Sequence, residues 1–131
     1  MLISEVARRS GVPTKTLRYY EEIGLLRPQR TPSGYRDYDE RVFDRLTFIR
    51  SAQALGLSLA EIRGIVSLRD NGEAPCAHVT QLLEDRSAAI ARTIRELRAL
   101  QSELRALTAR AEDFNPSQCD PAGICGLIKP A

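Results

Sequence analysis

The chain has 131 residues, 43% of them hydrophobic, and a net charge of +2, which suits one ordinary domain plus an extended element. No apolar run approaches the roughly 20 residues of a membrane-spanning helix, and MLISEVARR mixes apolar with charged residues, unlike a secretory signal. We therefore expect a cytoplasmic protein with no membrane partner. Three cysteines, an odd number, argue against a disulfide scaffold there and favour metal or redox use.

Basic residues are concentrated at the front of the chain. Residues 1–36 hold seven Lys/Arg against three Asp/Glu, a net charge of +4, whereas residues 71–131 hold seven against eight, a net charge of −1. This asymmetry favours contact with a polyanion through one end of the chain.

The first 24 residues predict two short helices separated by a turn. Apolar residues at helical spacing mark a first helix that stops at Ser10-Gly11, with Gly11 just past its end. Pro13 fits the first turn of a second helix, because the N–H that it lacks would be unpaired there. That helix runs through TKTLRYYEE and ends at Gly24. The pair is a candidate helix-turn-helix unit, although an ordinary helical hairpin has the same pattern.

Residues 27–38 predict a small β-hairpin, or wing. Two prolines and a glycine exclude a helix, while Tyr35 and Tyr38 suit a short strand, and PSG before them is a turn.

Two further helices follow the predicted wing. Asp39 is placed to cap a helix that reaches about Ala54. Ser58 and Glu61 have the spacing of a capping box for a second helix that ends near Arg69.

A long helix is predicted after the breaker DNGEAP. Residues 76–112 contain no Pro or Gly. Apolar residues recur there every seven positions, at Leu83, Ile90, Leu97, Leu104 and Ala111, with Leu100 and Leu107 between them; Val79 extends the pattern backwards, and Arg86 and Thr93 interrupt it. Such a helix would be about 50 Å long, too long to fold back on a small domain. It predicts a homodimeric coiled coil.

The fold expected from these elements is mainly α. It comprises a winged helix-turn-helix DNA-binding domain over residues 1–70, a dimerisation helix over 71–112 and a metal-binding loop and tail over 113–131.

Candidate DNA contacts lie on the second helix and in the wing. The first residues of a second helix reach base edges when it enters the major groove, which nominates Thr14, Lys15, Arg18 and Tyr19, whereas Tyr20 is divided between core packing and phosphate contact. Arg18 can read guanine or bind phosphate. Tyr35 and Arg36 at the wing suit phosphate or minor-groove contact.

The stretches LRYYEEIGLL and GYRDY, in this order, resemble the N-terminal domain of the MerR family of transcription regulators. The resemblance continues through the long helix. It implies a dimer that binds a palindromic promoter element and, on effector binding, distorts that DNA so that RNA polymerase can engage the promoter. It also implies DNA contacts by Lys15, Arg18 and Tyr19, and by Tyr35 and Arg36 in the wing.

The three cysteines lie at opposite ends of the long helix. Cys76 lies at its start, and Cys119 and Cys125 follow its end in the loop CDPAGIC. In an antiparallel dimer, Cys76 of one subunit would approach Cys119 and Cys125 of the other, which creates two sites of three thiols. Thiolates select soft ions. The resemblance favours a divalent ion as effector, mercury, cadmium, lead or zinc, because members that sense monovalent ions typically lack a cysteine at position 76.

Several alternatives remain open from the sequence. His78 or Asp120 could add a fourth ligand. A redox regulator of the same fold would instead pair Cys119 with Cys125 in a disulfide. Buried, inert cysteines are a further possibility. A thiol enzyme or metal carrier would not need the basic front end; with one His and no glycine-rich phosphate loop, we expect no enzyme.

Overall fold

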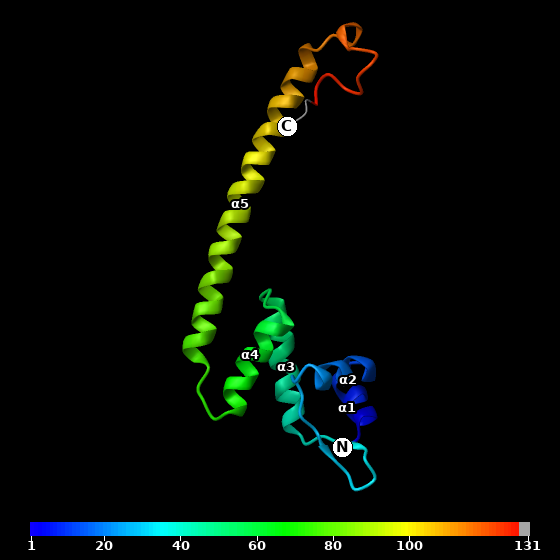
Figure 1. Ribbon diagram of the computed structural model, residues 1–131, viewed down its shortest axis with the longest axis vertical. Coiled ribbons are helices and arrows are strands. Elements are labelled where there is room, and N and C mark those ends of the chain that lie inside the picture. The colour runs from blue at the N-terminus through cyan, green and yellow to red at the C-terminus, as the bar shows by residue number, and fades with distance from the viewer. Residues whose placement is uncertain (129–131) are drawn as a thin grey trace. The chain divides into compact units, whose positions relative to one another are not determined.

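The computed structural model describes residues 1–128 and is mainly helical, as expected. The elements in chain order are α1 (Ile3–Ser10), α2 (Thr14–Glu22), β1 (Gln29–Arg30), β2 (Arg36–Asp37), α3 (Arg41–Ala54), α4 (Leu59–Asp70), α5 (Cys76–Asp113) and the short 3₁₀ helix η1 (Pro116–Gln118) (Figure 1). The chain forms two compact units, residues 1–86 and the residues from 87 onward. Within residues 1–128, no helix combines the length and the hydrophobicity needed to cross a membrane.

The core of the first unit lies among α1, α2, α3 and α4. Its most deeply buried side chains are Val6, Leu17, Leu25, Ile49 and Ile62. They come from α1, α2, the segment after α2, α3 and α4, so each of these elements contributes one apolar face to a single cluster.

The turn between α1 and α2 confirms the predicted helix-turn-helix. Gly11 has a φ of 77°, in the left-handed region that glycine tolerates, and its N–H donates to the carbonyl oxygen of Ala7 at 3.0 Å. Pro13 lies one position earlier than expected. It precedes the first turn of α2, and its carbonyl oxygen accepts the N–H of Leu17 at 3.0 Å.

The predicted wing is a two-stranded antiparallel hairpin. Gln29 pairs with Asp37 and Arg30 with Arg36. At the turn, the N–H of Gly34 donates to the carbonyl oxygen of Thr31 at 2.8 Å, and Gly34 adopts a φ of 84°, which explains the glycine in PSG.

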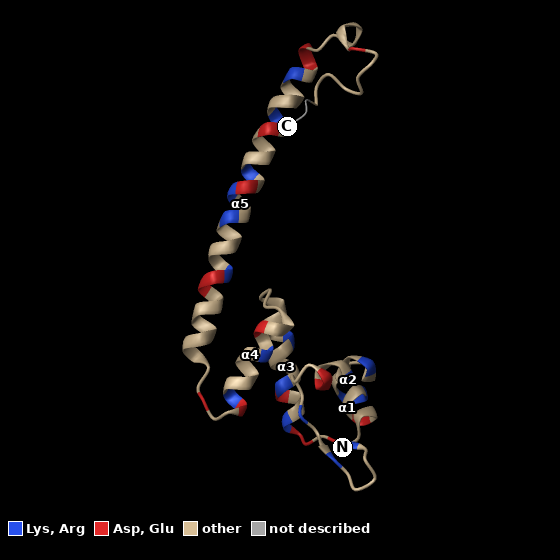
Figure 2. Cartoon of the chain, viewed as in Figure 1, with Lys and Arg blue, Asp and Glu red and all other residues tan. Residues whose placement is uncertain are grey.

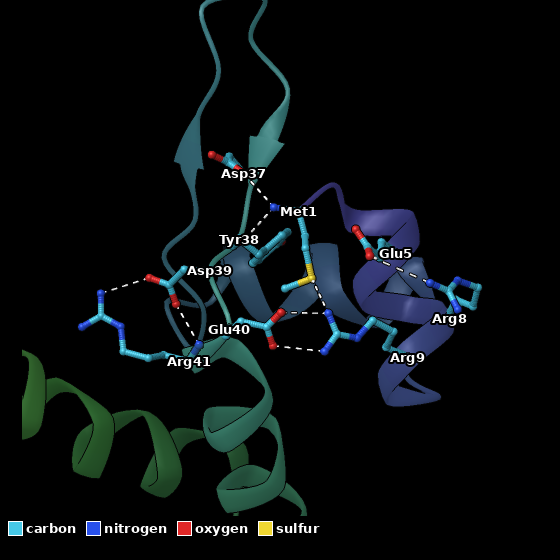
Figure 3. Close-up of polar contacts among 9 residues, drawn as sticks. All are labelled: Met1, Glu5, Arg8, Arg9, Asp37, Tyr38, Asp39, Glu40 and Arg41. Carbon is cyan, nitrogen blue, oxygen red and sulfur yellow. Dashed lines mark hydrogen bonds and ion pairs between the residues drawn. The ribbon is translucent and has the colours of Figure 1, made fainter.

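Polar contacts join the start of α3 to α1. The guanidinium of Arg9 forms a two-pronged ion pair with Glu40, at 2.9 and 3.1 Å (Figure 3). Arg9 thereby lowers the pKa of the Glu40 carboxyl. Its guanidinium also lies over the ring of Phe43. Asp39 accepts the backbone N–H of Arg41 at 2.9 Å, so it supports the first turn of α3 as predicted, although Glu40 lies between Asp39 and the helix.

The capping box at α4 is confirmed. The N–H of Glu61 donates to Ser58 Oγ at 3.1 Å, and the N–H of Ser58 donates to Glu61 Oε1 at 2.9 Å. Two of the N–H groups at the helix start are thus paired without tertiary contacts.

The first turns of α5 pack against the core of their own unit. Val79 and Leu82 are partly buried against that core, so Val79 does not simply extend the apolar stripe, as its spacing suggested. A β-carbon at Gly64 in α4 would lie 3.6 Å from His78 Nε2, and one at Gly56 would lie 2.6 Å from the Arg86 guanidinium. Glycine at position 56 therefore leaves room for Arg86, whereas position 64 lies at an ordinary contact distance from His78.

The rest of α5 carries an uncovered apolar stripe. No residue of α5 is buried in the single chain. The exposed members are Leu83, Ile90, Ile94, Leu97, Leu100 and Leu104. A solvated stripe of this length along one helix indicates a surface that another helix covers.

Candidate DNA interface and thiol segment

Helix α2 has one face in the core and another in solvent. Leu17 and Tyr20 are buried. Of the two roles considered for Tyr20, core packing and phosphate contact, the structure therefore shows core packing. Lys15, Arg18 and Tyr19 are exposed, and Thr14 is half-buried at the start of the helix. The packing of α2 therefore leaves three of the four candidate contacts in α2 exposed to solvent.

Arg18 and the wing residues line one hollow. A cavity of about 300 Å³ is lined by Leu2, Ile3, Ser4, Arg18, Arg30, Gly34, Tyr35 and Arg36. The structure thus brings together Arg18, Tyr35 and Arg36, which the sequence nominated separately, whereas Thr14, Lys15 and Tyr19 do not line this hollow. Tyr35 is 66% exposed. Three arginines beside an exposed aromatic ring are suited to a phosphate backbone.

Glu21 is a functional candidate that the sequence analysis missed. Its carboxylate pairs with Arg30 at 2.8 Å and with Nε of Arg36, and this pairing raises the pKa of Arg36. Basic residues mark the wing and α2 in Figure 2, where acidic residues of α2 lie among them. No local sequence pattern indicates this contact, because the two arginines lie 9 and 15 residues from Glu21, on β1 and β2.

Cys76 is the first residue of α5, and its side chain is exposed. Its carbonyl oxygen accepts the hydroxyl of Thr80 at 2.8 Å, a bond within the first turn of the helix. The exposure of Cys76 leaves its thiol open to a ligand or a partner.

The loop after α5 turns back on itself. The N–H of Gly123 donates to the carbonyl oxygen of Asp120 at 3.0 Å, and a β-carbon at Gly126 would lie 2.9 Å from the ring of Phe114 and 3.8 Å from Sγ of Cys119. Gly126 therefore packs against Cys119. Because Gly126 directly follows Cys125, the fold of the loop brings this part of the chain close to the Cys119 thiol. Asp120 Oδ1 accepts the N–H of Ala122 at 2.9 Å, so one of its oxygens already supports the turn.

The two loop thiols differ in environment. Cys119 is half-buried and Cys125 is exposed. The backbone N–H groups of Leu127 and Ile128 lower the pKa of the Cys125 thiol, because they favour the thiolate. A thiolate is the form that binds a soft metal ion, so this donor set fits such an ion.

Within residues 1–128, no group of three or more His, Cys, Asp or Glu side chains is arranged to hold a metal ion. This includes Cys76, Cys119 and Cys125, together with His78 and Asp120.

These features define a class of protein: a winged helix-turn-helix DNA-binding protein with a long helix whose apolar stripe is uncovered in one chain. Comparison with known families identifies which one. Residues 1–68 match the MerR HTH family regulatory protein, and residues 43–107 match the DNA-binding region of MerR. The chain belongs to the MerR family. It is a DNA-binding transcription regulator and not an enzyme; proteins of this family act as dimers on promoter DNA, together with RNA polymerase.

Similar proteins include metal-responsive regulators. The chain is 40% identical over 119 residues to the transcriptional regulator HmrR of Rhizobium leguminosarum bv. viciae, covering 91% of this chain and 92% of the relative. It is 37% identical over 112 residues to the mercuric resistance operon regulatory protein of Bacillus cereus, covering 85% of each. Among solved structures, the transcription regulator PbrR691 from Ralstonia metallidurans CH34 in complex with lead(II) is 36% identical, with a TM-score of 0.75, over 91% of this chain and 94% of that chain.

Proposed function

We propose that this protein is a promoter-bound activator that senses a soft divalent metal ion through three cysteines shared across a homodimer. Each site would take Cys76 from one subunit and Cys119 and Cys125 from the other. The proposal is supported most by one observation: Cys76 begins α5 and the other two thiols follow its end, while no three ligands gather within residues 1–128.

The uncovered stripe of α5 supports an antiparallel dimer. Its leucines and isoleucines would pack as a coiled coil. In that pairing, the start of one α5 meets the end of the other, so thiols from two chains converge twice per dimer. Pairing of the helices in the same direction would leave the thiols of Cys76 far from the loops, because 38 residues of helix rise about 57 Å.

The chemistry of the donors supports a soft ion. Thiolates favour mercury, cadmium, lead or zinc over hard ions. The relatives named for mercury resistance and solved with lead(II) are consistent with that class. His78 and Asp120 remain candidates for a fourth ligand.

The DNA end of the protein would carry out the response. Thr14, Lys15, Arg18 and Tyr19 on α2, and Tyr35 and Arg36 on the wing, are the proposed contacts to the promoter. A metal-dependent change in dimer geometry would deform the DNA between the two half-sites, at a cost of about 1–6 kcal/mol, so that RNA polymerase can engage it. We place the protein in the cytoplasm, the compartment that holds promoter DNA.

Mixing two inactive variants tests the shared site. Cys76→Ser homodimers and Cys119→Ser/Cys125→Ser homodimers should each fail to bind metal through three thiols and fail to induce transcription, while both still bind DNA. A heterodimer of the two retains one intact site, made of Cys76 from one chain and the loop thiols from the other. We expect it to recover metal binding at half the wild-type stoichiometry, measured by competition titration with a metal indicator.

Two outcomes would overturn this arrangement. No recovery in the heterodimer would exclude a site shared between subunits. Unchanged metal affinity and induction in Cys76→Ser would remove this residue from the site, and induction by diamide without metal would then favour the disulfide between Cys119 and Cys125. Variants His78→Gln and Asp120→Asn, titrated in parallel, show whether either side chain adds a fourth ligand.

A further inference from the structure

Glu21 is an acidic residue within the most basic part of the structure. It lies in the last turn of α2, and its side chain is 19% exposed. The sign of its charge is wrong for contact with a phosphate backbone. Its position therefore needs another explanation than direct binding of DNA.

The contacts of Glu21 join α2 to both strands of the wing. Oε1 accepts from Arg30 on β1 at 2.8 Å, and Oε2 accepts from Nε of Arg36 on β2. Arg30 and Arg36 are directly paired across the hairpin. One carboxylate thus holds two neighbouring guanidinium groups, and it is the only link of this kind between α2 and the hairpin among the described residues.

Without Glu21, the wing arginines would repel one another. Arg30 and Arg36 line the same hollow as Arg18, so three like charges face one small space. Repulsion between like charges disfavours the gathering of three guanidinium groups around one hollow. Long arginine side chains also lose rotamer entropy when they are fixed. Glu21 offsets the repulsion and restricts both side chains before DNA arrives.

We infer that Glu21 is a positioning residue for DNA binding: it fixes the wing, and the guanidinium groups of Arg30 and Arg36, relative to α2. The inference rests on the proposed role of the wing in DNA contact. It also adds Arg30 to the basic groups that face phosphate. A pre-arranged set of donors binds more tightly because less conformational freedom is lost on binding.

The two possible effects of Glu21 on DNA affinity have opposite signs. If its carboxylate acts only as a negative charge near the backbone, its neutralisation strengthens binding. If it positions the wing, neutralisation weakens binding although a repulsive charge has been removed. The direction of the change therefore discriminates between the two roles.

The test compares Glu21→Gln with Glu22→Gln in the full-length dimer. Glu22 is exposed, is adjacent in sequence and has no ion pair within residues 1–128, so its replacement removes the same charge without a positioning contact. The probe is a duplex that the wild-type protein selects from random-sequence DNA, and affinity is measured by fluorescence anisotropy over a range of salt concentrations.

We expect Glu21→Gln to weaken binding about tenfold, the effect of losing about one phosphate contact at moderate salt, and to make the slope of log affinity against log salt shallower by roughly one contact, or about 0.9. Glu22→Gln should bind equally or more tightly, with the wild-type slope. Glu21→Asp keeps the charge and should recover part of the affinity. Thermal unfolding of each variant separates this effect from loss of fold.

A double-mutant cycle covers the case in which Glu21→Gln unfolds part of the wing. Arg36→Gln should cost DNA affinity in the wild-type background and clearly less in a Glu21→Ala background, if the two residues act together. Equal affinity and equal salt slope for Glu21→Gln and Glu22→Gln would overturn the positioning role alone. No effect of Arg30→Gln and Arg36→Gln on affinity would overturn the proposed wing contact as well as this inference.

Discussion

At the scale of single residues, Tyr38 is the most unusual side chain of the core. It is 4% exposed, and its hydroxyl has no hydrogen-bond partner among the described residues. A buried hydroxyl without a partner costs free energy on folding. Burial also raises the pKa of Tyr38, since the charged form is disfavoured away from water.

Tyr38→Phe should therefore leave the free energy of unfolding unchanged or increase it by up to about 1 kcal/mol. The raised pKa adds a dependence on pH. The wild type should lose stability as the pH rises above the ordinary tyrosine value of about 10, because only the unfolded chain ionises readily there. The variant should lack this contribution. Urea unfolding from neutral to alkaline pH measures both effects, and a destabilised variant at neutral pH would contradict the prediction.

At the scale of elements, Gly11 and Gly56 allow the cost of a left-handed backbone conformation to be compared with the cost of a close side-chain contact. Gly11 and Gly56 have φ values of 77° and 85°. A β-carbon at Gly11 would meet no atom within 4 Å, whereas one at Gly56 would meet the guanidinium of Arg86. The end of α3 has no basic residue of its own in its last turn, so Arg86 brings a cation to the negative end of that helix.

Gly11→Ala should lower the free energy of unfolding by about 1–2 kcal/mol, the cost of the left-handed conformation for a residue with a β-carbon. Gly56→Ala should cost more, because it also displaces Arg86 from the end of α3. The excess should vanish in an Arg86→Ala background. Denaturant unfolding of the four variants tests this, and an excess that persists without Arg86 would show that another contact is responsible.

The elements themselves could be predicted from local sequence, but several contacts between them could not. Gly11, the pair Ser58 and Glu61, and the stretch without Pro or Gly after DNGEAP located the helices, because each acts within a few residues of itself. The inward packing of Val79 could not be predicted, since its heptad position fitted the stripe equally well. Glu21 was missed for a different reason: its partners, Arg30 and Arg36, lie in the wing and not in its own helix.

At the scale of the whole molecule, the apolar stripe of α5 predicts that the dimer is required for function. Leu97 is 59% exposed in the single chain and lies on that stripe. Leu97→Lys should therefore weaken dimerisation by roughly 3–6 kcal/mol, because each dimer contains two copies and burial of a leucine is worth about 1.5–3 kcal/mol. DNA affinity should fall with it, since a monomer binds only one half-site.

Sedimentation velocity at a series of protein concentrations measures this effect. Leu55→Lys is the matched control: Leu55 is 61% exposed but follows α3 and is not part of the stripe on α5. That variant should remain dimeric. A Leu97→Lys protein that sediments as the wild type does would show that the stripe is not the dimer surface.

The uncovered length of α5 also bears on the lifetime of newly made chains. Most of the stability of a helix in a protein comes from packing of its apolar face, so an unpartnered α5 would fray and offer its backbone to proteases. Degradation would then remove single chains faster than assembled ones. The cellular level of the regulator would depend on how quickly two copies meet after synthesis, and scarce chains would be cleared before they could occupy half a promoter.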